Sequence, residues 1–205
     1  MHFYDAVKKQ LEYVSELINR IYGVRGKIKW REDKGYWVLR TYRKHIVRDV
    51  YTFFSHGSKT WTVPRQFLDK GALSAWIRGF ADGDGSVRLR EEPLRRSYEI
   101  KLSSSNVASL TELREILKEE FGIDSSISTW VELKVRRGKV VKYRTYALNI
   151  TGEDDILRYA RFIGFRNPKQ VEQLREVVKR YSMTREEWQQ YKEELLEKRS
   201  KQKEK

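Results

Sequence analysis

The sequence predicts an α+β fold in which antiparallel sheets pack against helices and one structural unit is present twice. Three observations lead to this prediction. Apolar residues recur at helical spacing in several stretches, and alternating runs joined by short turns predict paired strands. In addition, two segments of the 205-residue chain can be laid over each other in the same order.

The first part of the chain predicts a helix, a hairpin and a second helix. Apolar residues from Val7 to Ile21 recur at helical spacing and predict a helix over 3–23 that ends at Gly23. Two alternating runs joined by "DKG" predict a hairpin over 26–43, and "IVRDVYTFF" predicts a short helix over 46–54. A turn-rich connector follows.

The second part predicts a longer series with the same ending. The expected elements are an apolar helix over 72–81, strands over 85–90 and 95–105, a helix over 106–122 with Asn106 as N-cap, a hairpin over 126–151 around "RGK", helices over 152–165 and 167–181, and a charged helical tail from 184.

The two parts match in an ordered way. Leu11 falls on Leu110 and Gly23 on Gly122, and a hairpin containing "RTY" follows in each part. Amphipathic helices before hairpins can resemble each other by chance, but the ordered agreement favours duplication. The second copy has a front part, 72–105, that we expect to be unmatched in the first.

The charge balance points to a polyanionic partner. There are 43 Lys and Arg against 29 Asp and Glu, a net charge of +14, and the charged tail contributes little of this excess. Nucleic acid or an anionic membrane are the partners that fit, although a basic protein without a special partner is the plain alternative. No helix combines a basic face with a broad apolar one, which disfavours a membrane surface.

Other classes are excluded by composition. The chain has no cysteine, so disulfides and thiolate metal sites are excluded, and its three histidines are scattered. It has neither an apolar run of membrane-spanning length nor a signal-peptide pattern at its start. We therefore expect an intracellular, cytoplasmic protein.

The stretch "GFADGDGS" (79–86) ends the apolar helix on two aspartates separated by glycine. An EF-hand loop would need glycine at 87 and an acid at 93, where the chain has Val87 and Pro93. A simple acidic turn is the plain alternative. However, the small residues Ala72, Ala75 and Gly79 lie on one helix face and would let a second helix approach closely. Carboxylates and carbonyl oxygens brought together at the end of such a helix pair suit Mg²⁺.

The sequence "WIRGFADGDGS" resembles the motif of the LAGLIDADG homing endonucleases, with residues 77–85 filling its nine places. This resemblance implies a saddle-shaped fold and a site-specific DNA endonuclease, archaeal-like and encoded in an intron or intein. It covers about residues 1–182. The implied organisation is an incomplete first half (1–57), a linker (58–71), a complete half (72–182) and a charged helical tail (183–205).

The resemblance also implies roles for individual residues. Asp84 would bind Mg²⁺ or another divalent cation and act in catalysis, with Gly85 lending a backbone carbonyl. Ala75, Gly79 and Asp82 would belong to the helix interface, Asp82 by supporting the helix end. Arg78 stands where the family has a small residue. Three further roles are implied: Lys169 and its counterpart Lys59 as basic catalytic residues, and Ser104 or Ser105 as the residue that orients the water.

We expect the strands to hold double-stranded DNA on a basic face. Alternation places apolar residues such as Val131, Leu133 and Val135 against helices, and basic residues on the other side. The DNA-binding candidates are Lys27, Lys29, Arg31, Arg88, Arg90, Lys101, Lys134, Arg136, Lys142 and Arg144.

The chain contains one motif helix, and the first half lacks a counterpart of residues 72–101. A truncation, a second chain pairing through the helix 72–83, or a decaying remnant would each explain this. The predicted function is Mg²⁺-dependent hydrolysis of DNA by a homing endonuclease. The alternatives are an RNA-splicing maturase and a non-cleaving DNA-binding remnant of the same fold.

Overall fold

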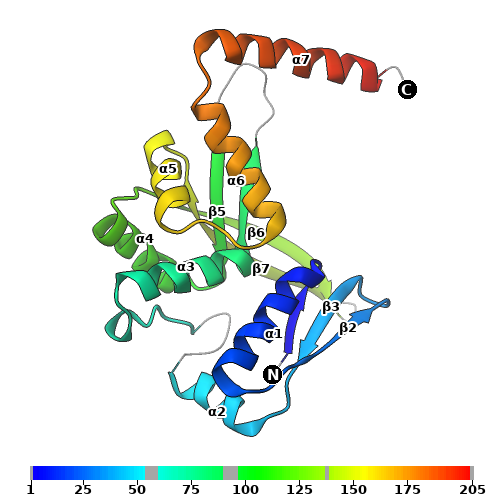
Figure 1. The fold of residues 1–205 in the computed structure, drawn as a ribbon, viewed down its shortest axis with the longest axis vertical. Helices are drawn as coiled ribbons and strands as arrows, with labels where there is room; N and C mark the ends of the chain where they lie inside the picture. The colour runs from blue at the N-terminus through cyan, green and yellow to red at the C-terminus, as the bar shows by residue number, and fades with distance from the viewer. Residues whose placement is uncertain (1, 54–59, 90–96, 137–138, 204–205) are drawn as a thin grey trace.

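The computed structural model describes residues 2–53, 60–89, 97–136 and 139–203 (Figure 1). Its elements in chain order are β1 (His2–Asp5), α1 (Lys8–Tyr22), β2 (Lys27–Arg31), β3 (Tyr36–Arg40), α2 (Lys44–Phe53), the 3₁₀ turn η1 (Arg65–Phe67), α3 (Lys70–Asp84), β4 (Gly85–Leu89), β5 (Tyr98–Ser104), α4 (Val107–Phe121), β6 (Ser126–Arg136), β7 (Lys139–Ile150), α5 (Glu153–Phe162), α6 (Pro168–Tyr181) and α7 (Arg185–Lys203).

The strands form two antiparallel sheets, a small one in the order β1-β3-β2 and a large one in the order β4-β5-β7-β6. Helix α1 packs on the small sheet, whereas α3, α4 and α6 pack on the large one. Figure 1 shows the small sheet with α1 and α2 at one end of the molecule and α7 projecting at the other end. The predicted α+β architecture with antiparallel sheets is confirmed.

The two sheets repeat one unit in register. In the small sheet Leu39 pairs with Phe3 on one side and Ile28 on the other. In the large sheet Leu148 pairs with Leu102 and with Ile127 in the same manner. Both preceding helices end in a left-handed glycine, Gly23 with φ 67° and Gly122 with φ 66°. Gly23 and Gly122, and likewise Ile28 and Ile127, are pairs that the sequence alignment brings together, so the repeat is present in the structure. The two "RTY" triplets, however, are not equivalent, because Thr145 corresponds to Tyr36 in this register.

The N-terminus differs from the expectation. The expected helix over 3–23 begins only at Lys8, because residues 2–5 form the edge strand β1 against β3. The side chain of Asp5 accepts a hydrogen bond from the amide of Val7 (2.7 Å), much as Ser104 accepts one from Asn106 (3.1 Å). Strand β1 is therefore the counterpart of β5. The unmatched front part of the second copy is shorter than 72–105 and consists of α3 and β4.

The two units bury very different amounts of apolar surface. Among the described residues, 22 buried side chains form one core between the large sheet and its helices, whereas the small sheet and its helices bury four. Ile77 of α3 lies in the large core and Leu39 in the small one, both with no accessible surface. The large unit supplies the rigid support for the end of α3.

Part of the connector before α3 packs on the large unit. Val63 is a buried member of the large core. Trp61 donates from Nε1 to the hydroxyl of Ser104 (2.9 Å), and Arg65 forms ion pairs with Glu119 and Glu120, both at 2.9 Å. The residue bounds of the expected halves and linker remain a prediction.

The long hairpin of β6 and β7 is exposed on the face that we expected to be covered. Leu133 is 70% accessible and Val135 73%, so the prediction that these residues pack against helices is wrong. Strand β5 pairs with β7 only as far as Tyr146, and beyond that point β6 and β7 pair only with each other. A two-stranded ribbon that extends past the sheet also extends past the helices.

The tail helix α7 is tied to α6 by a buried arginine. Arg180 donates to Glu176 (2.8 Å) and to the hydroxyl of Tyr191. Within the described part of the chain, no helix is both long and apolar enough to cross a bilayer.

Candidate functional site

Helix α3 is held by three kinds of contact. Asp69 caps its N-terminus by accepting from the amide of Ala72 (2.8 Å), and Ile77 anchors its apolar face in the large core. On its polar side, Ser74 donates to the carbonyl of Phe162 and Arg78 to that of Ile163, both at 2.5 Å. Arg78 thus satisfies a carbonyl at the C-terminal end of α5, which explains a long side chain at a place where the family has a small one.

The two aspartates of the motif have different surroundings. Asp82 is only 7% accessible, and its Oδ1 accepts hydrogen bonds from the amides of Arg166 (2.8 Å) and Asn167 (3.0 Å). Asp84 is exposed, and no described residue donates a hydrogen bond or forms an ion pair with its carboxylate. Desolvation by the surrounding protein raises the pKa of Asp84. Asp82 therefore fixes the helix end, whereas Asp84 is available to a ligand.

Gly85 is required by close packing. A Cβ at this position would lie 2.4 Å from the carbonyl oxygen of Ala81 and 3.0 Å from Cδ2 of Leu102. Its own carbonyl accepts from Nε2 of Gln170 at 2.5 Å. Gln170 is buried, and its Oε1 has no hydrogen-bond partner.

The hydrogen bond between Gln170 of α6 and the carbonyl of Gly85 holds the start of α6 beside the end of α3. Lys169 is exposed in the first turn of α6, and its amide donates to the capping side chain of Asn167 (3.2 Å). Because the next residue, Gln170, contacts Gly85, the Lys169 side chain leaves the chain beside the end of the motif. Lys59, its expected counterpart, lies outside the described residues. The hydroxyl of Ser104 is occupied by Trp61 and by the amide of Asn106.

The donors at this end fit a divalent cation that is shared with a phosphate. Among the described residues no three His, Cys, Asp or Glu side chains lie together as a metal site. Mg²⁺, however, is commonly held by one or two carboxylates plus substrate phosphates and water. Asp84 offers one carboxylate without a described partner, so the donor set is incomplete without a further acid or a nucleic acid.

A cavity of about 480 Å³ lies between α3 and the small unit. Ala75, Gly79 and Gly83 line it from α3, and Val14 and Leu17 line it from α1. The guanidinium of Arg166 lies 4.5 Å from the ring centroid of Tyr13 and bridges the two units. The face expected to meet a second motif helix, including Ala75 and Gly79, is thus partly open in this chain.

Some of the expected DNA-binding residues lie on the sheet faces that are turned away from the cores. In β2, Lys27, Lys29 and Arg31 alternate with the core-facing Ile28. In the large sheet, Arg88 and Lys101 alternate in the same way with buried residues. Arg31 is held by Asp33 (2.8 Å), Arg88 lies 3.7 Å from Glu99, and Nζ of Lys101 lies 3.8 Å from the ring centroid of Trp130.

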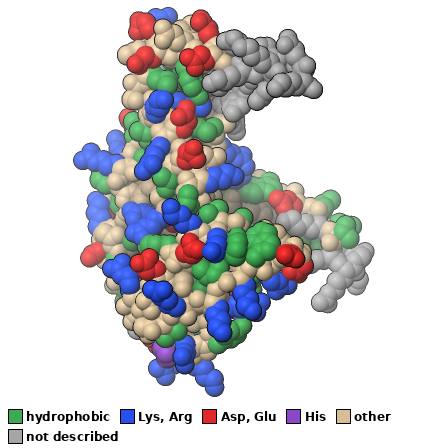
Figure 2. All heavy atoms as spheres, turned by 45° about the vertical axis from the view of Figure 1, so that its right-hand side comes forward, with side chains coloured by type: hydrophobic (Ala, Val, Ile, Leu, Met, Phe, Trp, Pro, Cys, Tyr) green, Lys and Arg blue, Asp and Glu red, His purple; other side chains and the backbone are tan. Residues whose placement is uncertain are grey.

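Two expected DNA contacts lie on the opposite side of the ribbon. Lys142 pairs with Leu133 and Arg144 with Val131, on the face that continues the core side of the sheet. Lys134 and Arg136 belong to β6, where they pair with Val141 and Lys139, and the structure describes only their backbone. Arg90 lies outside the described residues. In Figure 2, Lys and Arg side chains are spread widely over the visible face, with exposed hydrophobic side chains between them.

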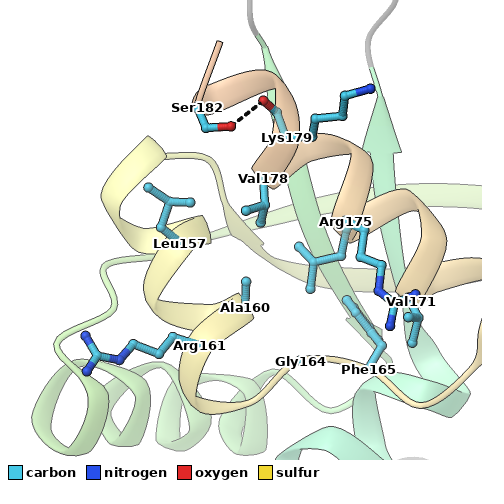
Figure 3. A pocket seen from close by; sticks show the side chains of 11 residues that line it. Leu157, Ala160, Arg161, Gly164, Phe165, Val171, Arg175, Val178, Lys179 and Ser182 are labelled. Carbon is cyan, nitrogen blue, oxygen red and sulfur yellow. Dashed lines mark hydrogen bonds between the residues drawn. The ribbon is translucent and has the colours of Figure 1, made fainter.

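A second hollow, of about 660 Å³, lies between α5 and α6 (Figure 3). Leu157 and Ala160 of α5 face Val178 of α6 across it, and no acidic side chain lines it. Asp84 is not among its lining residues. It offers apolar surface and three cations, Arg161, Arg175 and Lys179, but no carboxylate that could hold a divalent cation.

Sequence reasoning missed Gln170. The residue follows Lys169 directly, but an amide side chain within a helix gives no sign that it reaches a carbonyl 85 residues away. It also missed the exposed tyrosines beside the basic residues of the small sheet, because the segment that contains Tyr4 was expected to be helical.

Comparisons with known proteins agree with this geometry. Residues 72–164 match the LAGLIDADG-like domain model. The structure of I-DmoI in complex with DNA and Ca superposes with a TM-score of 0.54 at 15% identity, covering 85% of this chain and 82% of that one. The structure of I-DmoI in complex with DNA and Mn gives 0.52 at 14%, covering 80% and 79%.

A second group of structures shares the fold. The N-terminal LAGLIDADG domain of DUF199/WhiA gives a TM-score of 0.51 at 18% identity, covering 84% of this chain and 75% of that one. Full-length DUF199/WhiA from Thermatoga maritima gives 0.50 at 15%, covering 89% and 53%. No curated protein sequence matches the chain. Residues 72–164 thus match a LAGLIDADG-like domain, and the chain as a whole has the fold of the LAGLIDADG homing endonucleases.

Proposed function

We propose that this protein is a site-specific DNA endonuclease of the homing type, which hydrolyses phosphodiesters of double-stranded DNA with Mg²⁺ or another divalent cation. The observation that carries the proposal is Asp84, an exposed carboxylate without a described partner, at the rigidly held end of the motif helix. Desolvation raises its pKa, and perturbed carboxylates of this kind are common at functional sites. The resemblance adds the proposal that the gene lies in an intron-like mobile element.

Each residue has a definite task in this proposal. Asp84 and, by resemblance, the backbone carbonyl of Gly85 would hold the cation, which when bound acts as a Lewis acid toward the phosphodiester. Asp82 fixes the backbone of Arg166 and Asn167, so that α6 starts beside the motif. Lys169, and by resemblance Lys59, stabilises the negative charge that develops on the phosphate. The exposed lysines and arginines of β2, β4 and β5 hold the DNA backbone.

Cutting both strands requires a second acid. In the described part of the chain, α3 and β4 have no counterpart in the small unit, so the described residues supply one such carboxylate. A second chain can supply the other through the open face of α3, where Ala75 and Gly79 allow close approach. We therefore expect nicked DNA from an unpaired chain and a double-strand break from a pair.

The test compares Asp84→Asn with a matched control, Asp154→Asn, which changes an exposed aspartate in the first turn of α5. A supercoiled plasmid library with randomised sites is incubated with Mg²⁺, and nicked and linear products are counted. The wild type and Asp154→Asn should cut. Asp84→Asn should lose about a thousandfold in rate, which corresponds to roughly 4 kcal/mol, and should still bind DNA. Cutting by Asp84→Asn at the wild-type rate would refute the assignment.

A second candidate is a DNA- or RNA-binding protein of the same fold that does not cleave, such as a maturase or a remnant. The described residues contain one motif helix with one such carboxylate, which favours this candidate over an enzyme that acts alone. Binding without cutting by either wild type or Asp84→Asn, at every protein concentration, would select it. Appearance of cutting as concentration rises would select the paired endonuclease.

A further inference from the structure

The outer face of the small sheet carries aromatic side chains among its cations. Tyr4 and Tyr36 form an edge-to-face pair with ring centroids 5.4 Å apart. His2 lies edge-to-face against Tyr4 and Tyr42, both at 6.1 Å, and its Nδ1 lies 3.1 Å from the hydroxyl of Tyr4. Tyr4 is 56% accessible and Tyr42 70%. We call these four residues the ring cluster.

The strand register shows which side of the sheet these rings occupy. Phe3, Leu39 and Ile28 form one cross-strand row, and this row faces the small core. The rows on either side of it therefore face away from the core. One contains His2, Arg40 and Lys27, and the other contains Tyr4, Val38 and Lys29. Tyr36 pairs with Arg31 on the same outer side.

The cations of this face are available to an anion. Lys27 and Lys29 are exposed, and no described acidic side chain forms an ion pair with either of them. Arg31 is held by Asp33, so the free charge is concentrated on the two lysines beside the rings. Cations that alternate with exposed rings form the arrangement that binds a sugar–phosphate backbone and stacks its bases.

The large sheet shows that the fold does not require rings here. By the repeat, Tyr4 corresponds to Ser103 and Tyr36 to Thr145, while Lys27 and Lys29 correspond to Ser126 and Ser128. The large sheet keeps the same backbone with small hydroxyl side chains at those places. The outer face of the large sheet has a ring at another place, Trp130 at the position of Arg31, and Nζ of Lys101 lies 3.8 Å from its centroid. On the small sheet Tyr4 and Tyr42 are more than half exposed, so their rings are open to a ligand.

We propose that the outer face of the small sheet binds unpaired nucleotides of a single-stranded nucleic acid, with bases stacked on Tyr4, Tyr36 and Tyr42 and phosphates on Lys27 and Lys29. In a duplex the faces of the bases are covered by their neighbours, so exposed rings cannot stack on them, whereas single strands offer these faces freely. The site uses neither Asp84 nor cleavage, but it shares Lys27 and Lys29 of β2 with the duplex-binding surface of the proposed function, so the test changes the rings alone.

The test replaces rings by the residues of the other sheet. The double variant Tyr4→Ser/Tyr36→Thr is titrated by fluorescence anisotropy against oligo(dT) and oligo(U) of about 12 nucleotides, and against a duplex of the same length. Affinity for single strands should fall about 10- to 100-fold, because stacking contributes roughly 1–3 kcal/mol per base. Its dependence on salt should stay unchanged, since no charge is removed. Duplex affinity should change less than about threefold.

Two control variants keep the result interpretable. Tyr4→Phe/Tyr36→Phe retains both rings and should bind single strands as the wild type does. Ser103→Ala/Thr145→Ala removes hydroxyls at the matching places of the large sheet and should leave single-strand binding intact. Thermal unfolding checks that every variant is folded. The strand bound more tightly by the wild type identifies DNA or RNA as the source.

Several results would overturn the proposal. Absence of single-strand binding by the wild type would do so, and would leave the face to a protein partner. An equal loss on duplex and single strand, or a loss in the phenylalanine variant, would show that stacking is not the cause. Unchanged binding by the serine–threonine variant would remove the rings from the site.

Discussion

The small and the large sheet share a backbone but differ on both faces. They have the same strand order and register, with Leu39 and Leu148 at equivalent central places. On the inner side the large sheet supports 22 buried residues and the small one four, among those described. On the outer side one sheet carries Tyr4 and Lys29 where the other carries Ser103 and Ser128. The two sheets therefore share their strand pairing and differ in the side chains on both faces.

The second difference is the helix and strand that precede the large unit. Asp84 ends α3 and Gly85 begins β4, and the small unit has neither element in the described residues. The large unit thus combines the thicker core with the candidate catalytic end. The small unit contributes surface for binding and one wall of the cavity beside α3.

The largest expected effect separates two glycines, one in each unit. A Cβ at Gly85 meets the backbone oxygen of Ala81, whereas a Cβ at Gly26 meets first the flexible side chain of Leu39, also at 2.4 Å. Backbone cannot move as cheaply as a side chain, so Gly85→Ala should cost about 3 kcal/mol of unfolding free energy and Gly26→Ala about 1 kcal/mol. Urea denaturation of both variants measures this. Equal costs would show that the two units tolerate strain alike.

A smaller effect concerns the phosphate contacts of the small sheet. Lys27→Ser/Lys29→Ser replaces both lysines by the residues of the large sheet. The slope of log affinity for duplex DNA against log salt should fall in magnitude by about 1.8, because two phosphate contacts are lost. Glu-to-Gln replacement at an exposed tail position, Glu193, serves as the control and should leave the slope unchanged. An unaltered slope in the lysine variant would place the duplex on the large sheet alone.

The smallest effect concerns how the charge of Asp84 changes the stability of the protein. The pKa of Asp84 is raised above its ordinary 3.8 by desolvation, so the folded state prefers the protonated form. The stability from this group is complete below pH 3.8 and is lost as the pH rises through the raised pKa. At neutral pH the ionised carboxylate also lies at a helix C-terminus, where negative charge is unfavourable.

Asp84→Asn should therefore stabilise the protein at pH 7 by about 0.5 kcal/mol, raising the melting temperature by about 1–2 °C. The gain should vanish as the pH falls through the raised pKa toward 3.8. Asp154→Asn, at the N-terminal end of α5, should shift the melting temperature in the opposite direction at pH 7. A gain for Asp84→Asn that persists at low pH would show that its charge is not the cause.

Much of the fold could be predicted from the sequence, because it depends on local pattern. Helix α4 runs from its cap Asn106 to Gly122, and β4 follows the motif, as expected. The separation of the two aspartates into a supporting and an exposed one also follows from the resemblance. In the structure, backbone amides bind Asp82 and leave Asp84 open.

The remaining features depend on contacts that are distant in sequence. Strand β1 continues the helical spacing of α1, and only its pairing with β3 reveals that it is extended. Lys142 and Arg144 were expected on the DNA face. In a hairpin, however, a shift of one residue at the turn exchanges the faces, and the register at "RGK" cannot be predicted from alternation. Nor does alternation indicate whether a helix covers Leu133.

The contacts that fix the motif helix also set the order in which the protein can be completed on the ribosome. Ser74, Arg78, Asp82 and Gly85 are each held by groups between 84 and 88 residues further along the chain. None of these bonds can form until the segment from Phe162 to Gln170 has been synthesised and has left the exit tunnel. The end of α3 that carries Asp84 is thus assembled only after the whole large sheet and α5 have been synthesised.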